Sequence, residues 1–140
     1  MSANAHLLTF VDASGWIAMI NRRDALHQKA LQVYQQRFRQ GGYFVTSSVV
    51  LLEVGNWVSP APTRKLAIDL LDRIARSARV EVVHISEGLN QRGWTLYRGR
   101  PDKDWGIIAC ISFVVMQERG IHEALTGDHH FEQAGFTRLL

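Results

Sequence analysis

The sequence predicts an α/β fold built on a parallel sheet. Short apolar runs alternate along the chain with longer segments in which apolar residues recur at helical spacing. Strands separated in this way by helices form β–α–β units, whose strands pair in parallel. The chain has 140 residues, of which 46% are hydrophobic and 21% charged, so we expect residues 1–140 to form a single globular domain.

The first half of the chain predicts two strands and four helices. Residues 7–11 form an apolar run, and after residues 12–15 a helix is expected through Ile20. Asp24 is expected to cap a second helix, which runs to residue 39 and is stopped by Gly41 and Gly42. Residues 43–46 predict the second strand.

Cap signals and prolines divide the segment that follows the second strand. Ser47 or Ser48 caps a helix that reaches about residue 57. Pro60 and Pro62 then interrupt the chain, and Thr63 opens a further helix through residue 74.

The second half predicts three strands and two helices. Residues 80–84 are a strand candidate, and Ser86 caps a helix that ends near residue 97. Residues 105–116 are apolar on nearly all sides, which predicts a buried helix that Gly120 ends. Residues 124–126 and 136–139 predict the last two strands.

The composition excludes several classes of protein. Cys110 is the one cysteine and lies in an apolar segment, so it is expected to be a core residue, and an internal disulfide is excluded. No apolar run reaches the roughly 18 residues of a membrane span. Residues 1–6 have no basic stretch typical of a signal peptide. We therefore expect a cytoplasmic protein with no membrane partner.

The positive charge is compatible with a nucleic-acid partner but does not establish one. The formal net charge is +3, and thirteen of the sixteen basic residues are arginine. Arginine binds phosphate in bidentate fashion and stacks on bases. Because +3 is small, charge alone favours an ordinary solvated surface.

Three acidic residues follow predicted strands. Asp12 ends the first strand, Glu53 lies on the helix after the second, and Asp128 follows the fourth. Ligands of parallel sheets bind beyond the carboxyl ends of the strands, so the three carboxylates are expected to converge there. Each also has an ordinary explanation: Asp12 as a helix cap, Asp128 as a turn residue, and Glu53 as a partnered charge in an apolar stretch.

Carboxylates that converge in this way either acquire raised pKa values or bind a divalent metal ion. Two of them 4 Å apart repel by about 4 kcal/mol at an effective dielectric of 20. Hard oxygen ligands suit Mg²⁺ or Mn²⁺ rather than Zn²⁺. Ser14 is placed to orient Asp12 or a metal-bound water. His129 and His130 are adjacent, so their side chains are expected to point apart and to have surface or packing roles.

Three segments resemble the PIN-domain family, which includes the VapC-type toxin ribonucleases of bacterial toxin–antitoxin pairs. They are residues 10–14 (FVDAS), 52–56 (LEVGN) and 124–136 (ALTGDHHFEQAGF), and the resemblance spans nearly the whole chain. It implies a three-layer α/β/α sandwich with a mostly parallel central sheet. It also implies Mg²⁺- or Mn²⁺-dependent cleavage of RNA phosphodiesters, a homodimer, and a partner antitoxin.

The resemblance also implies roles for particular residues. Asp12, Glu53 and Asp128 are the expected catalytic acids, with Asp12 and Asp128 as metal ligands and Glu53 as a ligand or as the group that orients the attacking water. From their position in the sequence, and not from the resemblance, Arg100 and Lys103 are expected to hold the RNA backbone.

The sequence departs from the family at one acid. Where the family usually has an aspartate at the start of the long buried helix, this chain has Ala109, either as a natural loss or as an engineered change. Asp104 lies five residues earlier, about 140° round a helix from Ala109. If Asp104 instead precedes the helix, it is free to supply part of the missing charge.

Two alternative functions remain open on the sequence. The first is a PIN-like module that binds RNA or a protein but cuts weakly or not at all, because Ala109 carries no carboxylate. The second is a phosphate-handling enzyme of another doubly wound α/β family. Against the second, no glycine-rich phosphate loop follows a strand.

Overall fold

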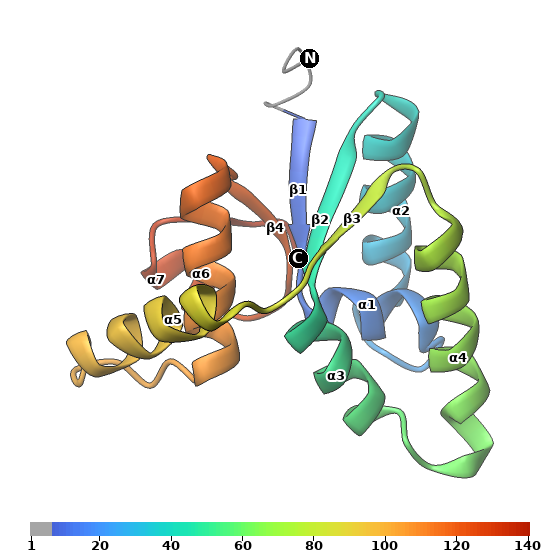
Figure 1. The fold of residues 1–140 in the computed structure, drawn as a ribbon. Coiled ribbons are helices and arrows are strands. Elements are labelled where there is room, and N and C mark those ends of the chain that lie inside the picture. Colours follow the sequence, from blue (N-terminus) through green and yellow to red (C-terminus); the bar gives the residue numbers. More distant parts are fainter. Residues whose placement is uncertain (1–6) are drawn as a thin grey trace.

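A five-stranded sheet, parallel at every strand pair, runs through the computed structural model, which describes residues 7–140 (Figure 1). The strand order is β3-β2-β1-β4-β5. The strands are β1 (Leu8–Val11), β2 (Tyr43–Ser47), β3 (Val80–Val83), β4 (Glu123–Leu125) and β5 (Thr137–Arg138). The prediction of an α/β fold with a parallel sheet is confirmed.

Helices cover both faces of this sheet (Figure 1). One layer contains α1 (Ala13–Ile20), α2 (His27–Arg39), α3 (Ser48–Trp57) and α4 (Ala61–Arg76). The other contains α5 (Glu87–Gly99), α6 (Ile107–Arg119) and α7 (His130–Gln133). The three-layer α/β/α arrangement is therefore confirmed, and no helix among residues 7–140 is long and apolar enough to cross a membrane. The prediction that residues 1–6 are not part of a signal peptide concerns residues that lie outside the described part of the chain.

The central position of β1 decides which loops meet. Phe10 pairs with Val45 of β2 on one side and with Ala124 of β4 on the other. Because the strands are parallel, β1, β2 and β4 all end at the same edge of the sheet. The residues that follow these three strands are thereby brought to one place.

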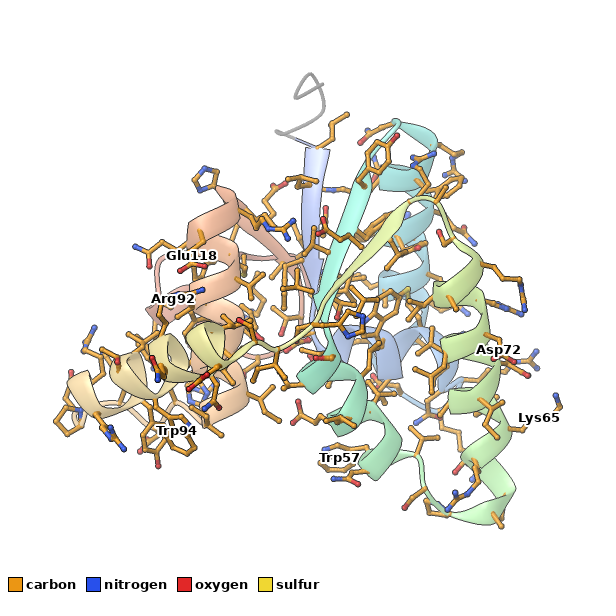
Figure 2. All side chains as sticks on the ribbon, in the orientation of Figure 1. Trp57, Lys65, Asp72, Arg92, Trp94 and Glu118 are labelled. Carbon is orange, nitrogen blue, oxygen red and sulfur yellow. The ribbon has the colours of Figure 1, made fainter. Side chains whose placement is uncertain are left out.

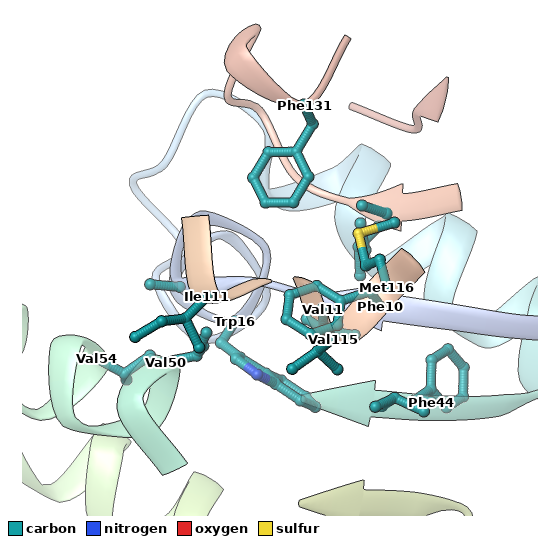
Figure 3. Close-up of a cluster of buried hydrophobic side chains, with 14 of the residues drawn as sticks. Phe10, Val11, Trp16, Phe44, Val50, Val54, Ile111, Val115, Met116 and Phe131 are labelled. Carbon is teal, nitrogen blue, oxygen red and sulfur yellow. The ribbon is translucent and has the colours of Figure 1, made fainter. Parts of the chain in front are cut away.

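Large apolar side chains on both faces of β1 anchor this arrangement. Phe10, Trp16, Phe44, Met116 and Phe131 are all almost fully buried (Figure 3). Each side chain of this size contributes about 1.5–3 kcal/mol on burial. They belong to strands and helices of all three layers, so the edge of the sheet rests on a continuous core. Cys110 is buried in α6, as expected.

The structure corrects three predicted helix starts. Asp24 does not cap α2, because its carboxylate accepts the Leu26 N–H at 2.8 Å in a local turn and the helix begins at His27. Helix α4 begins at Ala61 instead of Thr63, since a proline in the first turn loses no helical hydrogen bond. Helix α6 begins at Ile107, so Trp105 precedes it.

The short helix α7 was not predicted. It spans only His130–Gln133, and a single turn has too few residues to show a helical period.

Candidate active site

A cleft of about 640 Å³ lies at the carboxyl edge of the sheet, between α1, α3 and α6. Its acidic lining residues are Asp12, Asp24, Glu53, Asp104 and Asp128. Within residues 7–140, no lysine or arginine lines it. The structure thus brings together the three acids that follow strands, and it places Asp104 with them.

Asp12 is held at the cleft by donors from two separate parts of the chain. Its Oδ1 accepts hydrogen bonds from the Ser14 hydroxyl at 2.7 Å and the Gly15 N–H at 3.1 Å. Its Oδ2 accepts one from the Thr126 hydroxyl at 2.9 Å. Asp12 therefore caps α1 and faces the cleft with the same carboxylate, so the two interpretations of this residue are compatible.

The same two hydroxyls hold the segment that leads to Asp128. Ser14 Oγ accepts the Gly127 N–H at 3.0 Å, and Thr126 Oγ1 accepts the Asp128 N–H at 3.0 Å. Each hydroxyl donates its one proton to Asp12 and accepts a backbone N–H at a lone pair of its oxygen. Ser14 therefore orients Asp12, as expected.

Gly15 permits the close approach of α1 to β4. A β-carbon at this position would lie 2.2 Å from the carbonyl oxygen of Leu125, a backbone atom that cannot move aside. The absence of a side chain at Gly15 thus lets the Asp12 end of α1 reach the Thr126 end of β4.

Two acids of the cleft, Asp12 and Glu53, have raised pKa values. Burial raises the pKa of Asp12 to about 6, although its three hydrogen bonds lower it, and the nearby Asp128 adds to the rise. Burial, and then the charge of Asp128, also raise the pKa of Glu53 above its ordinary value. Among the described residues no lysine or arginine lines the cleft to offset this repulsion, so a bound cation would relieve it.

The two histidines after Asp128 contradict the expectation that they point apart. The Nδ1 atoms of His130 and His129 lie 3.1 Å and 3.9 Å from the same oxygen, Asp128 Oδ1. The backbone at His129 is helical, with φ −64° and ψ −18°, and Asp128 Oδ1 also accepts the His130 N–H at 2.9 Å. This turn brings both rings to one carboxylate, and His130 lines the cleft.

Ala109 and Asp104 lie in the same cleft. Ala109 is the third residue of α6 and is half-buried. Asp104 is exposed and precedes the helix, so helix geometry does not fix its direction. The carboxylate of Asp104 is therefore available at the wall where Ala109 contributes only a methyl group.

Arg100 and Lys103 do not line the cleft. The Arg100 guanidinium pairs with both carboxylate oxygens of Asp102 at 3.0 Å and lies 5.1 Å from the centre of the Trp105 ring. Arg100 borders a smaller hollow of about 260 Å³ between α5, α6 and α7. A role in RNA binding for either residue stays a prediction.

Sequence reasoning missed four residues of this site: Asp24, Trp57, Thr126 and His130. Trp57 is 71% exposed and projects from the end of α3, one turn after Glu53 (Figure 2). The four-residue spacing from Glu53 was a signal that could have found it. Thr126 offered no local signal, because its partner Asp12 is 114 residues away.

Comparisons with known proteins agree with this fold. The chain matches the PIN domain family over residues 9–137. It is 27% identical over 132 residues to the 23S rRNA-specific endonuclease VapC20 of Mycobacterium tuberculosis, a match that covers 94% of this chain and 98% of that protein.

Two solved structures resemble the fold. The crystal structure of M. tuberculosis VapC20, described as a sarcin–ricin loop cleaving toxin, matches with a TM-score of 0.82 and 27% identity, covering 93% of this chain and 96% of that one. VapBC2 of Rickettsia felis, bound to a DNA fragment from its promoter, matches with a TM-score of 0.67 and 14% identity, covering 94% and 96%. The second likeness is one of fold alone.

Proposed function

Because the chain belongs to the PIN-domain family, we propose that it is a metal-dependent ribonuclease that hydrolyses RNA phosphodiesters as the toxin of a toxin–antitoxin pair. The observation that carries this proposal is the cleft lined by five carboxylates and, within residues 7–140, by no lysine or arginine. A phosphate backbone approaches such a cleft favourably only when cations offset the acids.

The donor set fits a hard divalent ion, Mg²⁺ or Mn²⁺. Asp12 and Asp128 are the proposed ligands. From the residues that the structure describes, Asp12 Oδ2 accepts one hydrogen bond, from Thr126, which leaves it a lone pair for an ion. When bound, the ion lowers the pKa of a coordinated water and stabilises charge that develops on the phosphate oxygens.

The remaining side chains orient the water and the metal ligands, and one of them accepts a proton. Glu53, whose pKa is raised by burial and by the charge of Asp128, is suited to orient the attacking water and to accept its proton. Ser14 and Thr126 keep Asp12 in place. Asp104 supplies negative charge beside Ala109.

Trp57 supports an RNA with unpaired bases. Its ring is exposed at the cleft, where a base next to the scissile phosphate can stack on it. Arg100 and Lys103 are proposed to hold the backbone further along the strand, which predicts an RNA affinity that falls with added salt. The similarity to VapC20 makes ribosomal RNA the first substrate to test.

Further features of the proposal concern organisation and partners. Residues 1–140 form one cytoplasmic domain that associates as a homodimer and binds an antitoxin protein. Apolar side chains exposed on α3 and α4 support a protein partner on that side of the molecule: Leu52, Leu66, Ile68 and Leu71.

A second candidate function follows from Ala109. Without a carboxylate at position 109 the chain is expected to bind Mg²⁺ weakly, because Mg²⁺ already uses few protein ligands. The chain would then be a catalytically weakened or inactive PIN-like module that binds RNA or a protein.

Cleavage of ribosomal RNA and of an unstructured RNA, with Mn²⁺ or with a chelator, tests the proposal. Cleavage is expected only with the metal, and Asp12→Asn, Glu53→Gln and Asp128→Asn should each abolish it. Asp69→Asn is the matched control, since Asp69 is an exposed acid on α4 that pairs with Lys65. RNA that is bound but left intact at every Mn²⁺ concentration would favour the second candidate.

A further inference from the structure

Asp128, His129 and His130 form a cluster with mixed oxygen and nitrogen donors at the rim of the cleft. Asp128 Oδ1 lies 3.1 Å from His130 Nδ1 and 3.9 Å from His129 Nδ1. The two imidazole rings lie 4.2 Å apart, and one donor atom from each of the three residues falls within 4.8 Å of the others. Sequence neighbours seldom converge in this way.

The backbone holds the cluster in this form. Asp128 Oδ1 accepts the His130 N–H at 2.9 Å, which closes the turn into α7. The next residue, Phe131, is buried and packs on Phe113 with ring centres 4.9 Å apart. The turn is therefore anchored in the core, whereas the His129 side chain is 64% exposed and gives an ion a route from solvent.

We propose that Asp128, His129 and His130 bind a divalent transition-metal ion of the Zn²⁺ class. In a tetrahedral Zn²⁺ site, ligand distances of about 2.0–2.1 Å place neighbouring donors roughly 3.3 Å apart. The separations of 3.1 and 3.9 Å fall close to this value. Three protein ligands leave the fourth position for water.

The ligand chemistry separates this site from the acidic one. Imidazole nitrogen binds Zn²⁺, Ni²⁺ and Cu²⁺ well, whereas Mg²⁺ prefers oxygen. The nearest other acid on α7, Glu132, faces Arg138, with Oε1 at 3.4 Å from Nε. The site thus offers two nitrogen ligands and one carboxylate. We therefore expect it to bind Zn²⁺ more tightly than Mg²⁺.

Sharing Asp128 gives the site a regulatory consequence, which rests on the proposed ribonuclease function. Zn²⁺ held by Asp128 Oδ1 adds positive charge beside the cleft and occupies an oxygen that the Mg²⁺ or Mn²⁺ site needs. Zn²⁺ is therefore expected to inhibit Mn²⁺-supported cleavage. Binding of Zn²⁺ does not itself depend on cleavage.

Calorimetric titration of the full chain, carrying no histidine tag, with Zn²⁺ and separately with Mg²⁺ tests the site. We expect one Zn²⁺ per chain, bound at least ~10-fold more tightly than Mg²⁺, and a loss of ~10-fold or more in the double variant His129→Gln/His130→Gln. The control is His122→Gln, an exposed histidine before β4 at the opposite edge of the sheet. Zn²⁺ binding by the double variant equal to that of the unaltered chain would overturn the proposal, provided that its circular dichroism shows it folded.

Two further measurements separate this inference from the ribonuclease proposal. Asp12→Asn removes an acid of the cleft but no Zn²⁺ ligand, so Zn²⁺ binding should persist in it. Visible absorption of bound Co²⁺ should report a site containing nitrogen in the unaltered chain and should vanish in the double variant. If these results hold while no RNA is cut, the metal site stands and the ribonuclease proposal fails.

The inhibitory consequence is tested by the ratio of cleavage with and without Zn²⁺, taken within each variant at constant Mn²⁺. This ratio should rise towards one in His129→Gln. Equal inhibition of the unaltered chain and His129→Gln would show that Zn²⁺ acts elsewhere.

Discussion

The Thr126 hydroxyl donates a 2.9 Å hydrogen bond to Asp12 Oδ2 across 114 positions of sequence. The same hydroxyl oxygen accepts the Asp128 N–H at 3.0 Å. One fully buried threonine therefore sets the relative positions of the two proposed metal ligands. Mutation of side chains that hold metal ligands in this way typically lowers metal affinity by about 10- to 100-fold.

Thr126→Val should weaken both folding and metal binding. The change leaves the partly buried Asp128 N–H without its acceptor, which should cost about 1–3 kcal/mol of unfolding free energy. Asp12 loses a hydrogen bond that lowers its pKa, so the pKa of Asp12 should rise further and Mn²⁺ affinity at pH 7 should fall by about 10-fold or more. Urea unfolding and calorimetry measure the two effects.

Thr9→Val is the matched control for this variant. Thr9 is a buried threonine on β1, and in the described part of the chain its hydroxyl has a single hydrogen-bonding contact, with Arg37 at 3.4 Å. Unchanged Mn²⁺ affinity in Thr126→Val, with destabilisation like that of Thr9→Val, would mean that Thr126 has a packing role alone.

Asp12→Asn should make the metal-free protein more stable above pH 6. The pKa of Asp12 is raised from 3.8 to about 6, so between these values the folded state binds more protons than the unfolded state. Stability of the unaltered chain therefore falls as pH rises through this window. Because Asp12 is partly accessible to solvent, the full shift is not expected to appear as stability. The free energy of unfolding of the variant, relative to that of the unaltered chain, should rise by on the order of 1–2 kcal/mol between pH 4 and pH 7.5.

Urea unfolding between pH 4 and pH 8 with a chelator measures this gain. Addition of Mn²⁺ should reverse the order, because only the unaltered chain offers the carboxylate. A pH-independent difference between the two proteins would argue against a raised pKa at Asp12.

Gly15→Ala should destabilise the fold by about 1–3 kcal/mol and reduce cleavage. The new β-carbon would lie 2.2 Å from the Leu125 carbonyl oxygen, so α1 must move away from β4. This movement would lengthen the hydrogen bond between Asp12 and Thr126. Gly55→Ala on α3 meets nothing within 4 Å and should instead stabilise the helix by about 0.5–1 kcal/mol. Thermal melts should therefore shift in opposite directions.

Ala109→Asp should tighten divalent-ion binding and raise RNA cleavage. Residue 109 lies in the first turn of α6, where the helix dipole favours an acid, and it faces the same cleft as Asp12 and Asp128. Mn²⁺ should therefore raise the melting temperature of this variant more than that of the unaltered chain. Ala109→Asn controls for size without charge. A variant that melts lower and gains neither affinity nor cleavage would make Asp104 the better candidate for the missing acid.

Trp57→Ala should weaken the binding of single-stranded RNA while leaving the fold intact. Loss of one stacked base costs about 1–3 kcal/mol, which is roughly 5- to 150-fold in affinity. Trp57→Phe should restore part of the affinity, because it keeps an aromatic face. Trp94→Ala is the control, since Trp94 on α5 is also exposed but does not line the cleft. Equal losses in both alanine variants, measured by fluorescence anisotropy, would contradict a specific stacking role.

The order of strands and helices was readable from the sequence because the signals are local. The first apolar run ends at Asp12. The side chains of Ser47 and Ser86 accept N–H groups from the first turns of the helices that follow them. Gly120 adopts the left-handed conformation that ends α6. Each signal depends on residues within one or two turns. The prediction that Asp12, Glu53 and Asp128 share one edge needed only a parallel sheet in addition.

Tertiary structure alone decided how the cleft is completed. The interpretation of Asp24 as a cap was locally reasonable, yet the loop between α1 and α2 carries it to the cleft. Both histidines after Asp128 converge because the turn into α7 closes over one carboxylate. Thr126 meets Asp12 because β4 pairs with β1 in the strand order β3-β2-β1-β4-β5. Such contacts depend on how distant segments pack, and the hydrophobic pattern that drives packing specifies which faces are buried but not which polar atoms meet at their edges.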